Sequence, residues 1–306
     1  MSATSESLAV TDVAAGCLLC GGQRVVPHFG ARADRQDGSP QTPQRYRITH
    51  SERRLVYDIV RCPDCGMVSL PRTQAPPVSY ADAADPYYLE QADERVANAH
   101  RLLDLIPAGG QLLELGCACG FLLVAARERG FAVRGIEPST WAAAHACSAF
   151  GLDVQTGSLD NIAVASGSCD VVVMADVIEH LLDPRRTVQQ IARVLRPGGR
   201  LLLLTPDVGS FVARALGPRW WGLLDDHYFY FSRQTLRRFL AEEGFAVERI
   251  AGLGRVFPLS HWVSKLAPYN RALHTSATRL TRALRLDGWH VSVNLGDQMA
   301  CVARKP

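Results

Sequence analysis

The chain has 306 residues, of which 47% are hydrophobic and 21% are charged, and its net charge is +3. These values describe a globular protein with room for one domain of ordinary size and a small module, and the net charge is too small to indicate a nucleic-acid partner. No apolar run is long enough to span a bilayer, and the first residues lack the basic start and apolar stretch of a secretory signal, so the sequence predicts a cytoplasmic protein.

Two cysteine pairs stand out in the N-terminal part of the chain, after residues 1–16, which are predicted to be a disordered leader. The members of each pair are two residues apart and a glycine follows, in the order Cys17, Cys20, Gly21 and Cys62, Cys65, Gly66. This pattern is typical of a ribbon that holds one structural zinc ion with four thiolates. The nine cysteines of a cytoplasmic chain likewise favour thiols or metal ligands over disulfides. The alternative is a set of redox-active or merely structural thiols.

The predicted zinc-ribbon-like module covers residues 17–75. Within it, Ala31–Gln44 has the composition of a polar loop, while Arg45–Ile48 and Arg53–Val60 alternate enough to be strands. A proline-rich connector, Pro71–Pro77, follows the second cysteine pair. The module is thus predicted to be small and rich in loops.

Residues 76–110 are predicted to be a helical linker, with a helix over Leu89–Ile106. The main domain is expected over residues 111–306 and begins with the stretch Gln111–Leu123, which reads QLLELGCACGFLL. Its leucines, interrupted by Glu114, form a run typical of a strand that is buried on both faces.

A tight turn of small residues follows that strand, formed by Gly116, Ala118 and Gly120. After the turn, an apolar helix ends at Gly130. Small residues let the backbone approach a ligand, and the N-terminus of the helix presents free N–H groups. A strand, a turn and a helix of this kind form the first half of a nucleotide-binding unit.

A carboxylate closes the next predicted strand, Ala132–Ile136, in the sequence Glu137-Pro138-Ser139. An acid at the end of the second strand, about 20 residues after the turn, can accept hydrogen bonds from both ribose hydroxyls of an adenosyl group. The alternative for Glu137 is a solvated acid in a loop.

The rest of the domain alternates between strands and helices. The predicted helices cover Thr140–Phe150 and Pro184–Leu195, and another begins after Ser232. The predicted strands are Asp153–Thr156, Asp170–Met174, Arg200–Thr205, Ala246–Ile250 and Met299–Arg304. This order predicts an α/β fold with a doubly wound, mostly parallel sheet.

Four ordered segments resemble the motifs of class I S-adenosylmethionine-dependent methyltransferases: Leu112–Leu123, Gly135–Ser139, Asp170–Pro184 and Val194–Pro206. The resemblance implies a Rossmann-like methyltransferase fold, whose last strand runs antiparallel in a hairpin with its neighbour. With the cysteine-rich module, the chain is similar to the zinc-bearing sugar C-methyltransferases of antibiotic pathways. It departs from the family pattern at Ala118, where glycine is usual.

The same resemblance implies S-adenosylmethionine as the cofactor. Ser158 and Leu159 would border the adenine, and Tyr88 would lie near the methionine end. The full predicted set of cofactor-binding residues is Tyr88, Glu114, Gly116, Ala118, Gly120, Glu137, Pro138, Ser158, Leu159, Ala175 and Asp176.

The predicted catalytic residues are His227, Asp226 and His180. His227 is the first candidate for the general base, because histidine titrates near neutral pH and Asp226 or Asp225 could orient it. An acid and a histidine in this region also match the sugar methyltransferases, and this similarity concerns Asp226 and His227. His180 is the second candidate, because it follows the strand end where cofactor and acceptor should meet. The alternative for both histidines is a hydrogen bond within a loop.

A helical insertion is predicted over residues 252–291, before the last strand. Within Tyr269–Leu286, apolar residues fall on one helical side, and four arginines supply positive charge: Leu273, Ala277, Leu280, Leu284, Arg271, Arg279, Arg282 and Arg285. The hypothesis is a lid over the acceptor site whose arginines attract an anionic acceptor. A membrane surface is the less favoured partner, and a purely structural lid is the simplest alternative.

The sequence therefore predicts a methyltransferase that acts on a small-molecule acceptor, such as a nucleotide-linked sugar or a natural-product intermediate, at oxygen or carbon. Two other classes of function stay open. One is a non-catalytic binding module on the same scaffold. The other is a dinucleotide-dependent oxidoreductase, which the Gly-x-Ala-x-Gly spacing disfavours because dinucleotide folds use Gly-x-Gly-x-x-Gly.

Overall fold

The computed structural model describes residues 17, 19–30, 58–71, 80–224 and 226–306. The predicted leader, the polar loop Ala31–Gln44, the strand Arg45–Ile48, most of the connector and Asp225 lie outside these residues. Of the predicted strand Arg53–Val60, only the end is described, where Ile59–Arg61 forms a strand. No helix in the described part of the chain is long and apolar enough to cross a membrane.

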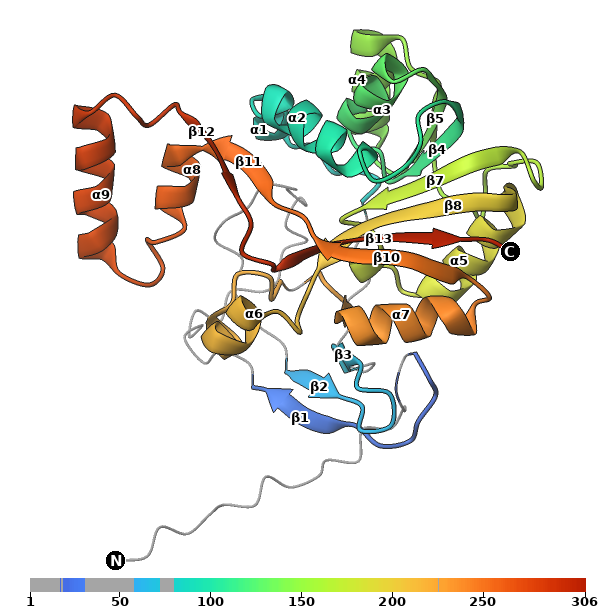
Figure 1. The fold of residues 1–306 in the computed structure, drawn as a ribbon, viewed down its shortest axis with the longest axis horizontal. Coiled ribbons are helices and arrows are strands. Elements are labelled where there is room, and N and C mark those ends of the chain that lie inside the picture. The colour runs from blue at the N-terminus through green and yellow to red at the C-terminus, as the bar shows by residue number, and fades with distance from the viewer. Residues whose placement is uncertain (1–16, 18, 31–57, 72–79, 225) are drawn as a thin grey trace, which may run out of the picture.

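A seven-stranded sheet forms the centre of the molecule (Figure 1). Its strand order is β10 (Ala246–Gly252), β13 (Gln298–Arg304), β8 (Leu195–Pro206), β7 (Cys169–Ala175), β4 (Gly110–Leu115), β5 (Phe131–Glu137) and β6 (Val154–Thr156). The strands from β8 to β6 are parallel, whereas β13 runs antiparallel to both β8 and β10. The predicted doubly wound sheet with an antiparallel last strand is confirmed.

Helices cover both faces of this sheet (Figure 1). One core lies between the sheet and α2 (Ala92–Leu103), α3 (Phe121–Glu128) and α4 (Thr140–Phe150). The other lies between the sheet and α5 (Pro184–Val194) and α7 (Arg233–Glu242). Along β8, Leu201 and Leu203 belong to one core and Leu202 and Leu204 to the other. This alternation explains the continuous apolar runs in the sequence, because a strand covered on both faces needs apolar residues throughout.

Two predicted elements, the linker helix and a strand of the central sheet, differ from the structure in their extent. The linker holds two helices, α1 (Pro86–Leu89) and α2, because the backbone leaves the helical region at Gln91. Strand β8 begins at Leu195, before the predicted strand Arg200–Thr205, so it includes the preceding Arg-Pro-Gly-Gly segment. Gly198 adopts a φ of +77° there, and the register with β7 shifts beyond Leu195, so the segment forms an irregular start of the strand.

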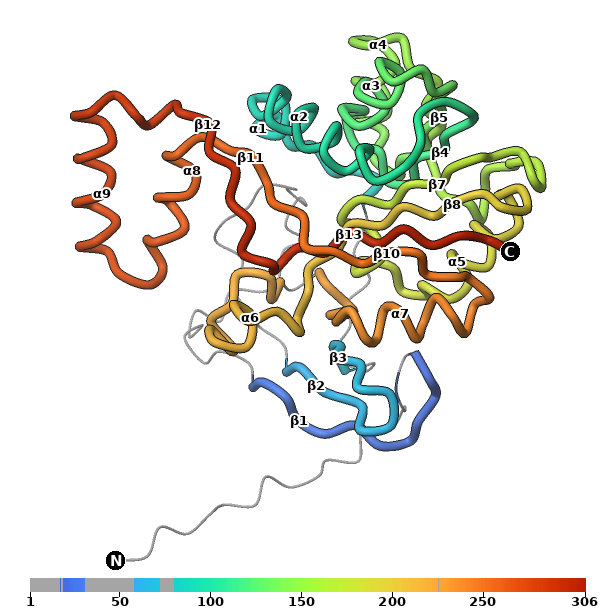
Figure 2. The backbone as a smooth tube through the Cα atoms, viewed as in Figure 1, coloured from blue at the N-terminus to red at the C-terminus, as the bar shows by residue number. Residues whose placement is uncertain are grey.

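The insertion between β10 and β13 is not purely helical. It is built on an antiparallel pair, β11 (Arg255–Pro258) with β12 (His290–Val293), which was not predicted. Between these strands lie α8 (Leu259–Ser264) and α9 (Arg271–Ala283), and α9 falls within the predicted helical segment Tyr269–Leu286. The backbone trace shows the hairpin carrying both helices to one end of the molecule, with α9 outermost (Figure 2).

The N-terminal module is attached to the main domain by a small sheet beneath α7 (Figure 1). Its order is β1 (Val26–Phe29), β2 (Ile59–Arg61), β3 (Val68–Ser69) and β9 (Phe229–Tyr230). Strand β9 belongs to the main domain, so the two parts share one sheet. They also share one core, which includes Met67 and Leu70 of the module and Leu236 of α7. The remaining short helices are α6 (Phe211–Leu216) and two 3₁₀ turns, η1 (Ile178–His180) and η2 (Gly217–Arg219).

Candidate functional site

The turn after β4 is formed by residues in the left-handed region of the backbone. Gly116, Ala118 and Gly120 have φ values of +69°, +45° and +84°. A Cβ atom at Gly116 would lie 2.7 Å from a methyl group of Val177, so glycine is required at that position. Ala118 adopts the same region with a side chain, which costs about 1–2 kcal/mol in this conformation. The small-residue turn predicted from the sequence is therefore present, and it places backbone rather than side chains beside the ends of β4 and β7.

Glu137 lies at the carboxyl end of β5, next to this turn. Its Oε2 accepts a hydrogen bond of 2.7 Å from the backbone N–H of Ala118, and its Oε1 accepts one of 2.8 Å from Ser139 N–H. Burial raises the pKa of the Glu137 carboxyl above its usual range, and the two N–H donors oppose this shift. Each carboxylate oxygen can still accept a second hydrogen bond.

A cavity of about 250 Å³ opens at this edge of the sheet. Parallel strands end there on either side of the point where the strand order reverses, which is where ligands bind in open α/β sheets. Ten of the predicted site residues line it: Tyr88, Gly116, Ala118, Glu137, Pro138, Ser158, Leu159, Ala175, Asp176 and His180. Four others, Glu114, Gly120, Asp226 and His227, are not in its lining, and neither is any residue of the insertion.

Several residues of this cavity were not predicted from the sequence. Arg95 of α2 is the one Arg or Lys among the described residues that line it, and its guanidinium lies 3.5 Å from the centre of the Tyr88 ring. Burial raises the pKa of Tyr88 to about 12, so this phenol stays protonated. Trp141 also lines the cavity, two residues after Ser139. Trp141 lies in the first turn of the helix that follows Glu137, so its place in the sequence could have predicted that it lines the cavity. No motif in the sequence around Arg95 predicts the same for that residue.

Glu114 is buried below the turn, and its Oε2 has no hydrogen-bond partner among the described residues. Burial raises the pKa of this carboxyl well above its usual range, and the nearby Glu137 adds to the shift. An uncharged carboxyl is favoured there, or a carboxylate with a cation close by.

This burial predicts a pH-dependent loss of stability. As pH rises above the ordinary glutamate pKa, the unfolded chain releases this proton while the folded chain retains it, so the free energy of unfolding falls. Each unit of pKa shift corresponds to about 1.4 kcal/mol. We expect Glu114→Gln to stabilise the unliganded protein at pH 7.5 and to have little effect at pH 4. Urea unfolding at both values measures this, and an equal effect at both would contradict it.

A second cluster of polar residues borders the cavity at His180, at the end of η1. The Nδ1 atom of His180 lies 3.0 Å from the backbone oxygen of Asp226, 3.4 Å from its Oδ2 atom and 3.1 Å from the hydroxyl of Tyr80. The ring of His227 meets that of His180 edge-on, with 4.6 Å between their centres. The structure thus brings together the three predicted catalytic residues, but only His180 belongs to the cavity wall.

The contacts of His180 determine which ring nitrogen carries hydrogen in the neutral form. A carbonyl oxygen can only accept, so the contact with the Asp226 backbone requires Nδ1–H to donate. Nε2 is then the nitrogen that can accept a proton, and the adjacent Asp226 carboxylate favours the charged ring. The side chains of His180 and Asp226 are 13% and 6% exposed, so water screens this interaction weakly.

The loop that carries Asp226 and His227 is fixed from two sides. Tyr228 N–H donates to the backbone oxygen of Glu179, whose side chain accepts a hydrogen bond of 3.0 Å from Thr205. On the other side, β9 pairs with β3 of the N-terminal module, and Leu70 N–H donates to the backbone oxygen of Tyr228. The module therefore supports the loop of Asp226 and His227 directly.

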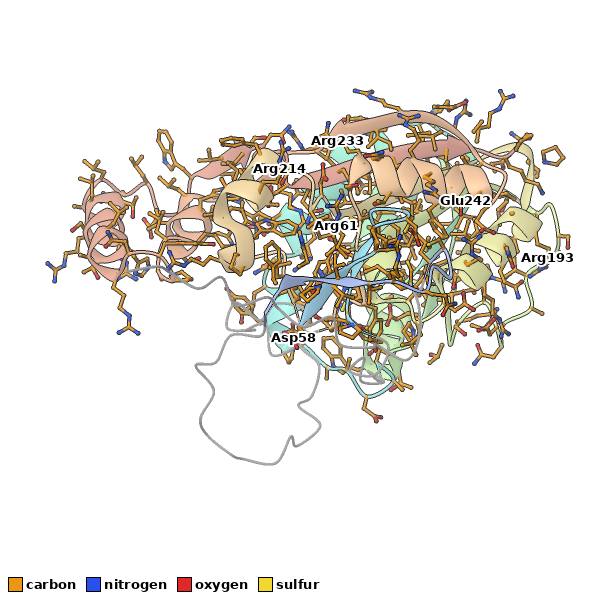
Figure 3. All side chains as sticks on the ribbon, turned by 90° about the horizontal axis from the view of Figure 1, so that it is seen from below. Asp58, Arg61, Arg193, Arg214, Arg233 and Glu242 are labelled. Atoms are coloured by element: carbon orange, nitrogen blue, oxygen red, sulfur yellow. The ribbon has the colours of Figure 1, made fainter. Side chains whose placement is uncertain are left out.

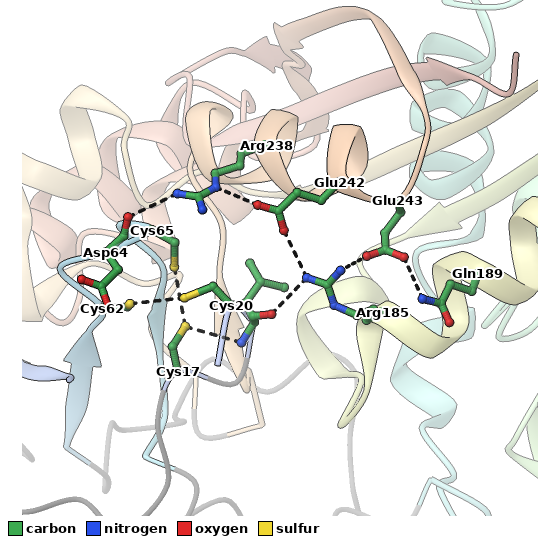
Figure 4. Close-up of polar contacts among 11 residues, drawn as sticks. Cys17, Cys20, Cys62, Asp64, Cys65, Arg185, Gln189, Arg238, Glu242 and Glu243 are labelled. Carbon is green, nitrogen blue, oxygen red and sulfur yellow. Dashed lines mark hydrogen bonds and ion pairs between the residues drawn. The ribbon is translucent and has the colours of Figure 1, made fainter. Parts of the chain in front are cut away.

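The four predicted metal ligands meet in one cluster (Figure 4). The sulfur atoms of Cys17 and Cys65 are 3.6 Å apart, and those of Cys20 and Cys62 are 3.7 Å apart. Four thiolates at about 2.3 Å from a tetrahedral zinc ion lie roughly 3.8 Å from one another, so the spacing fits this ion. The glycine after each pair, Gly21 and Gly66, has a positive φ, of +69° and +75°.

Ion pairs and hydrogen bonds join this cluster to the main domain (Figure 4). Arg185 of α5 donates to the backbone oxygen of Leu19 and forms ion pairs with Glu242 and Glu243. Arg238 of α7 donates to the backbone oxygen of Asp64 and also pairs with Glu242. The two cysteine pairs are therefore attached to the main domain by contacts with α5 and α7 as well as by the shared sheet.

Comparisons with known proteins agree with this geometry. The profile of a family described as "Methyltransferase domain" matches residues 88–250, which is more than half of the chain. A probable S-adenosylmethionine-dependent methyltransferase of Mycolicibacterium smegmatis is 32% identical over 147 residues, which cover 48% of this chain and 56% of that protein. A ubiquinone biosynthesis O-methyltransferase of Xanthomonas axonopodis is 28% identical over 162 residues, covering 49% of this chain and 68% of that protein.

One solved structure shows the same fold at low sequence identity. It is a complex between the Trm112 methyltransferase activator of Haloferax volcanii and a methyltransferase, with a TM-score of 0.53 and 18% identity. The match covers 71% of this chain and 93% of the matched one. Since the family profile matches more than half of the chain, from α1 into β10, the chain belongs to the family of methyltransferase domains.

Proposed function

We propose that this chain transfers a methyl group from S-adenosylmethionine to a small-molecule acceptor. The observation that carries the proposal is that one cavity holds both Glu137, at the end of the second strand, and His180, beside the end of β7. The first is suited to hold an adenosyl group, and the second to accept a proton. The family membership and the ubiquinone O-methyltransferase relative support the same conclusion.

The residues of the cavity fit this cofactor. The remaining lone pairs of the Glu137 carboxylate can accept hydrogen bonds from ribose hydroxyls, while Ala118 and Ser139 N–H fix its orientation. Arg95 supplies a cation for the carboxylate of the cofactor's methionine part. The buried Glu114, when charged, favours a positive group nearby. When bound, S-adenosylmethionine supplies a methyl group that is already activated by a sulfonium. The protein then has to position the acceptor and remove a proton from it.

We assign proton removal to His180. Its Nδ1–H donates to the Asp226 backbone, so in the neutral ring Nε2 is the nitrogen without hydrogen, and it would take a proton from a hydroxyl or from an acidic carbon of the acceptor. Asp226 stabilises the charged ring, while His227 and Tyr80 fix its orientation. The proposed acceptor is a small molecule that reacts at oxygen or carbon, such as a nucleotide-linked sugar or another biosynthetic intermediate. His227, the first candidate from the sequence, becomes a positioning residue in this proposal.

We also propose that Cys17, Cys20, Cys62 and Cys65 hold one structural zinc ion. Their sulfur atoms lie within 4.8 Å of one another, which suits a tetrahedral site. Four thiolates leave no open position for a reacting group, so the ion would not take part in methyl transfer.

Binding of the cofactor tests the proposed pocket. We expect Glu137→Ala to lower the affinity for S-adenosylmethionine at least tenfold, because two hydrogen bonds to a charged group are each worth about 1.5–3 kcal/mol. Isothermal titration calorimetry measures this directly. Glu128→Ala, at the end of α3, removes an acid from an exposed position and should leave the affinity unchanged. An unchanged affinity in Glu137→Ala would contradict the pocket, and failure to transfer a labelled methyl group to any acceptor would contradict the function.

A further inference from the structure

Helix α9 exposes an apolar stripe at the end of the molecule. None of its residues is buried. Leu273, Leu280 and Leu284 are 52%, 60% and 57% exposed, and their spacing of seven and four residues places them along one side of the helix. Trp289, just beyond the helix, is 65% exposed. Exposed leucines in a row on one element mark a surface that binds something, whereas single exposed leucines are ordinary.

The opposite side of α9 carries positive charge. Arg271, Arg279 and Arg282 fall there by helical periodicity, and Arg285 follows the helix. None of these four arginines forms an ion pair with another described residue. Asp287 is the one acid in the sequence between Gly252 and His290, so the segment has a single sign of charge.

The position of α9 argues against a lid over the acceptor site. The cavity has no lining residue from the insertion. In the backbone trace, α8 separates α9 from the rest of the domain (Figure 2). The side of α9 that is half-buried is formed by small and polar residues: His274, Ala277, Thr278 and Thr281. The leucine stripe is therefore left over after α8 and α9 have packed together.

We propose that α9 docks this protein on a membrane surface that contains anionic lipids. The leucines would enter the boundary between headgroups and acyl chains, and the arginines would interact with headgroup phosphates. A helix with leucine on one side and arginine on the other is the form that binds in the plane of such an interface. The proposal goes beyond methyl transfer and does not depend on it.

Other partners fit this surface less well. A second copy of the chain would bring two one-signed segments together, and like charges in an interface disfavour association. Nucleic acid would satisfy the arginines but would leave the leucines in water. An anionic lipid surface complements both sides of the helix at once.

Vesicle sedimentation tests the proposal. The full chain should bind vesicles of phosphatidylcholine with phosphatidylglycerol, and the partition coefficient should fall as salt rises. Pure phosphatidylcholine vesicles should bind it at least tenfold more weakly. Each cationic residue near an anionic surface contributes about fivefold, so Arg279→Glu with Arg282→Glu should lower the partition coefficient at least tenfold. Leu273→Ser with Leu280→Ser and Leu284→Ser should lower it at least as much.

Matched variants outside α9 control for general charge and apolar exposure. Arg61 and Arg214 are exposed and lie on β2 and α6 (Figure 3), so Arg61→Glu with Arg214→Glu changes the net charge equally. Phe211, at 78% exposure, provides Phe211→Ser as the apolar control. Both controls should bind vesicles like the unmutated chain. Absence of binding to anionic vesicles at low salt would overturn the proposal, and so would equal losses in the controls. Self-association removed by the leucine changes, without vesicle binding, would assign the stripe to a second copy instead.

Discussion

Replacing His180 with alanine is expected to lower the rate of methyl transfer by about 10²–10⁴-fold, the usual contribution of a general base. The affinity for S-adenosylmethionine should stay within about twofold, because Glu137 and the turn after β4 come from other elements. The reason for choosing His180 is geometric. It lines the cavity, and its Nδ1 contact with the backbone oxygen of Asp226 makes Nε2 the ring nitrogen that carries no hydrogen in the neutral form. Single-turnover kinetics with a labelled methyl donor measure the chemical step itself.

Two further variants separate a base from a structural residue. Added imidazole should restore part of the activity of His180→Ala, since the removed ring leaves space beside the acceptor, whereas a packing defect would not respond. His227→Ala should cost less than His180→Ala and should not be rescued, because His227 acts by holding the neighbouring ring. Near-normal turnover in His180→Ala would contradict the assignment. A large loss confined to His227→Ala would return the role of base to that residue.

Most of the cavity lining beside the ends of β4 and β5 could be predicted from the sequence. The strand, the turn and the acid at the next strand end are close in sequence, and parallel neighbours bring their ends together by topology alone. Glu137 therefore lies beside Ala118 as the spacing predicts. The same topology brings Ala175 and Asp176 to this edge, because Ala175 ends β7, the strand next to β4, and Asp176 follows it.

The remaining features depend on contacts between distant segments. Arg95 lies on a helix that precedes the sheet, and no pattern in the sequence points it toward the cavity. The choice between His180 and His227 depends on which ring faces the cavity, and the sequence context that favours His227 does not show this. The pairing of β3 with β9 was not predictable either, because a two-residue strand gives no periodic signal.

Removal of Cys62, a ligand of the proposed zinc ion, is expected to have two effects. In Cys62→Ser, the bound zinc should fall from about one per chain to near zero, and the free energy of unfolding should fall by several kcal/mol, because metal binding at such sites is coupled to folding. The rate of methyl transfer should fall as well. Strand β3, which follows this cysteine pair, pairs with β9 beside the loop of Asp226 and His227, so a loosened module releases that loop.

The affinity for S-adenosylmethionine separates this loss from general unfolding. Glu137 ends β5 and Ala118 lies in the turn after β4, and neither strand belongs to the small sheet that the module shares with the main domain. Below the melting temperature of Cys62→Ser, the cofactor should therefore still bind. Cys147→Ser is the matched control, because Cys147 is an exposed thiol on α4 outside the cluster. It should retain zinc, stability and turnover. Absence of metal in protein purified without chelator would contradict the proposed zinc site. Full turnover in Cys62→Ser that lacks zinc would show that the loop of Asp226 and His227 keeps its position without the module.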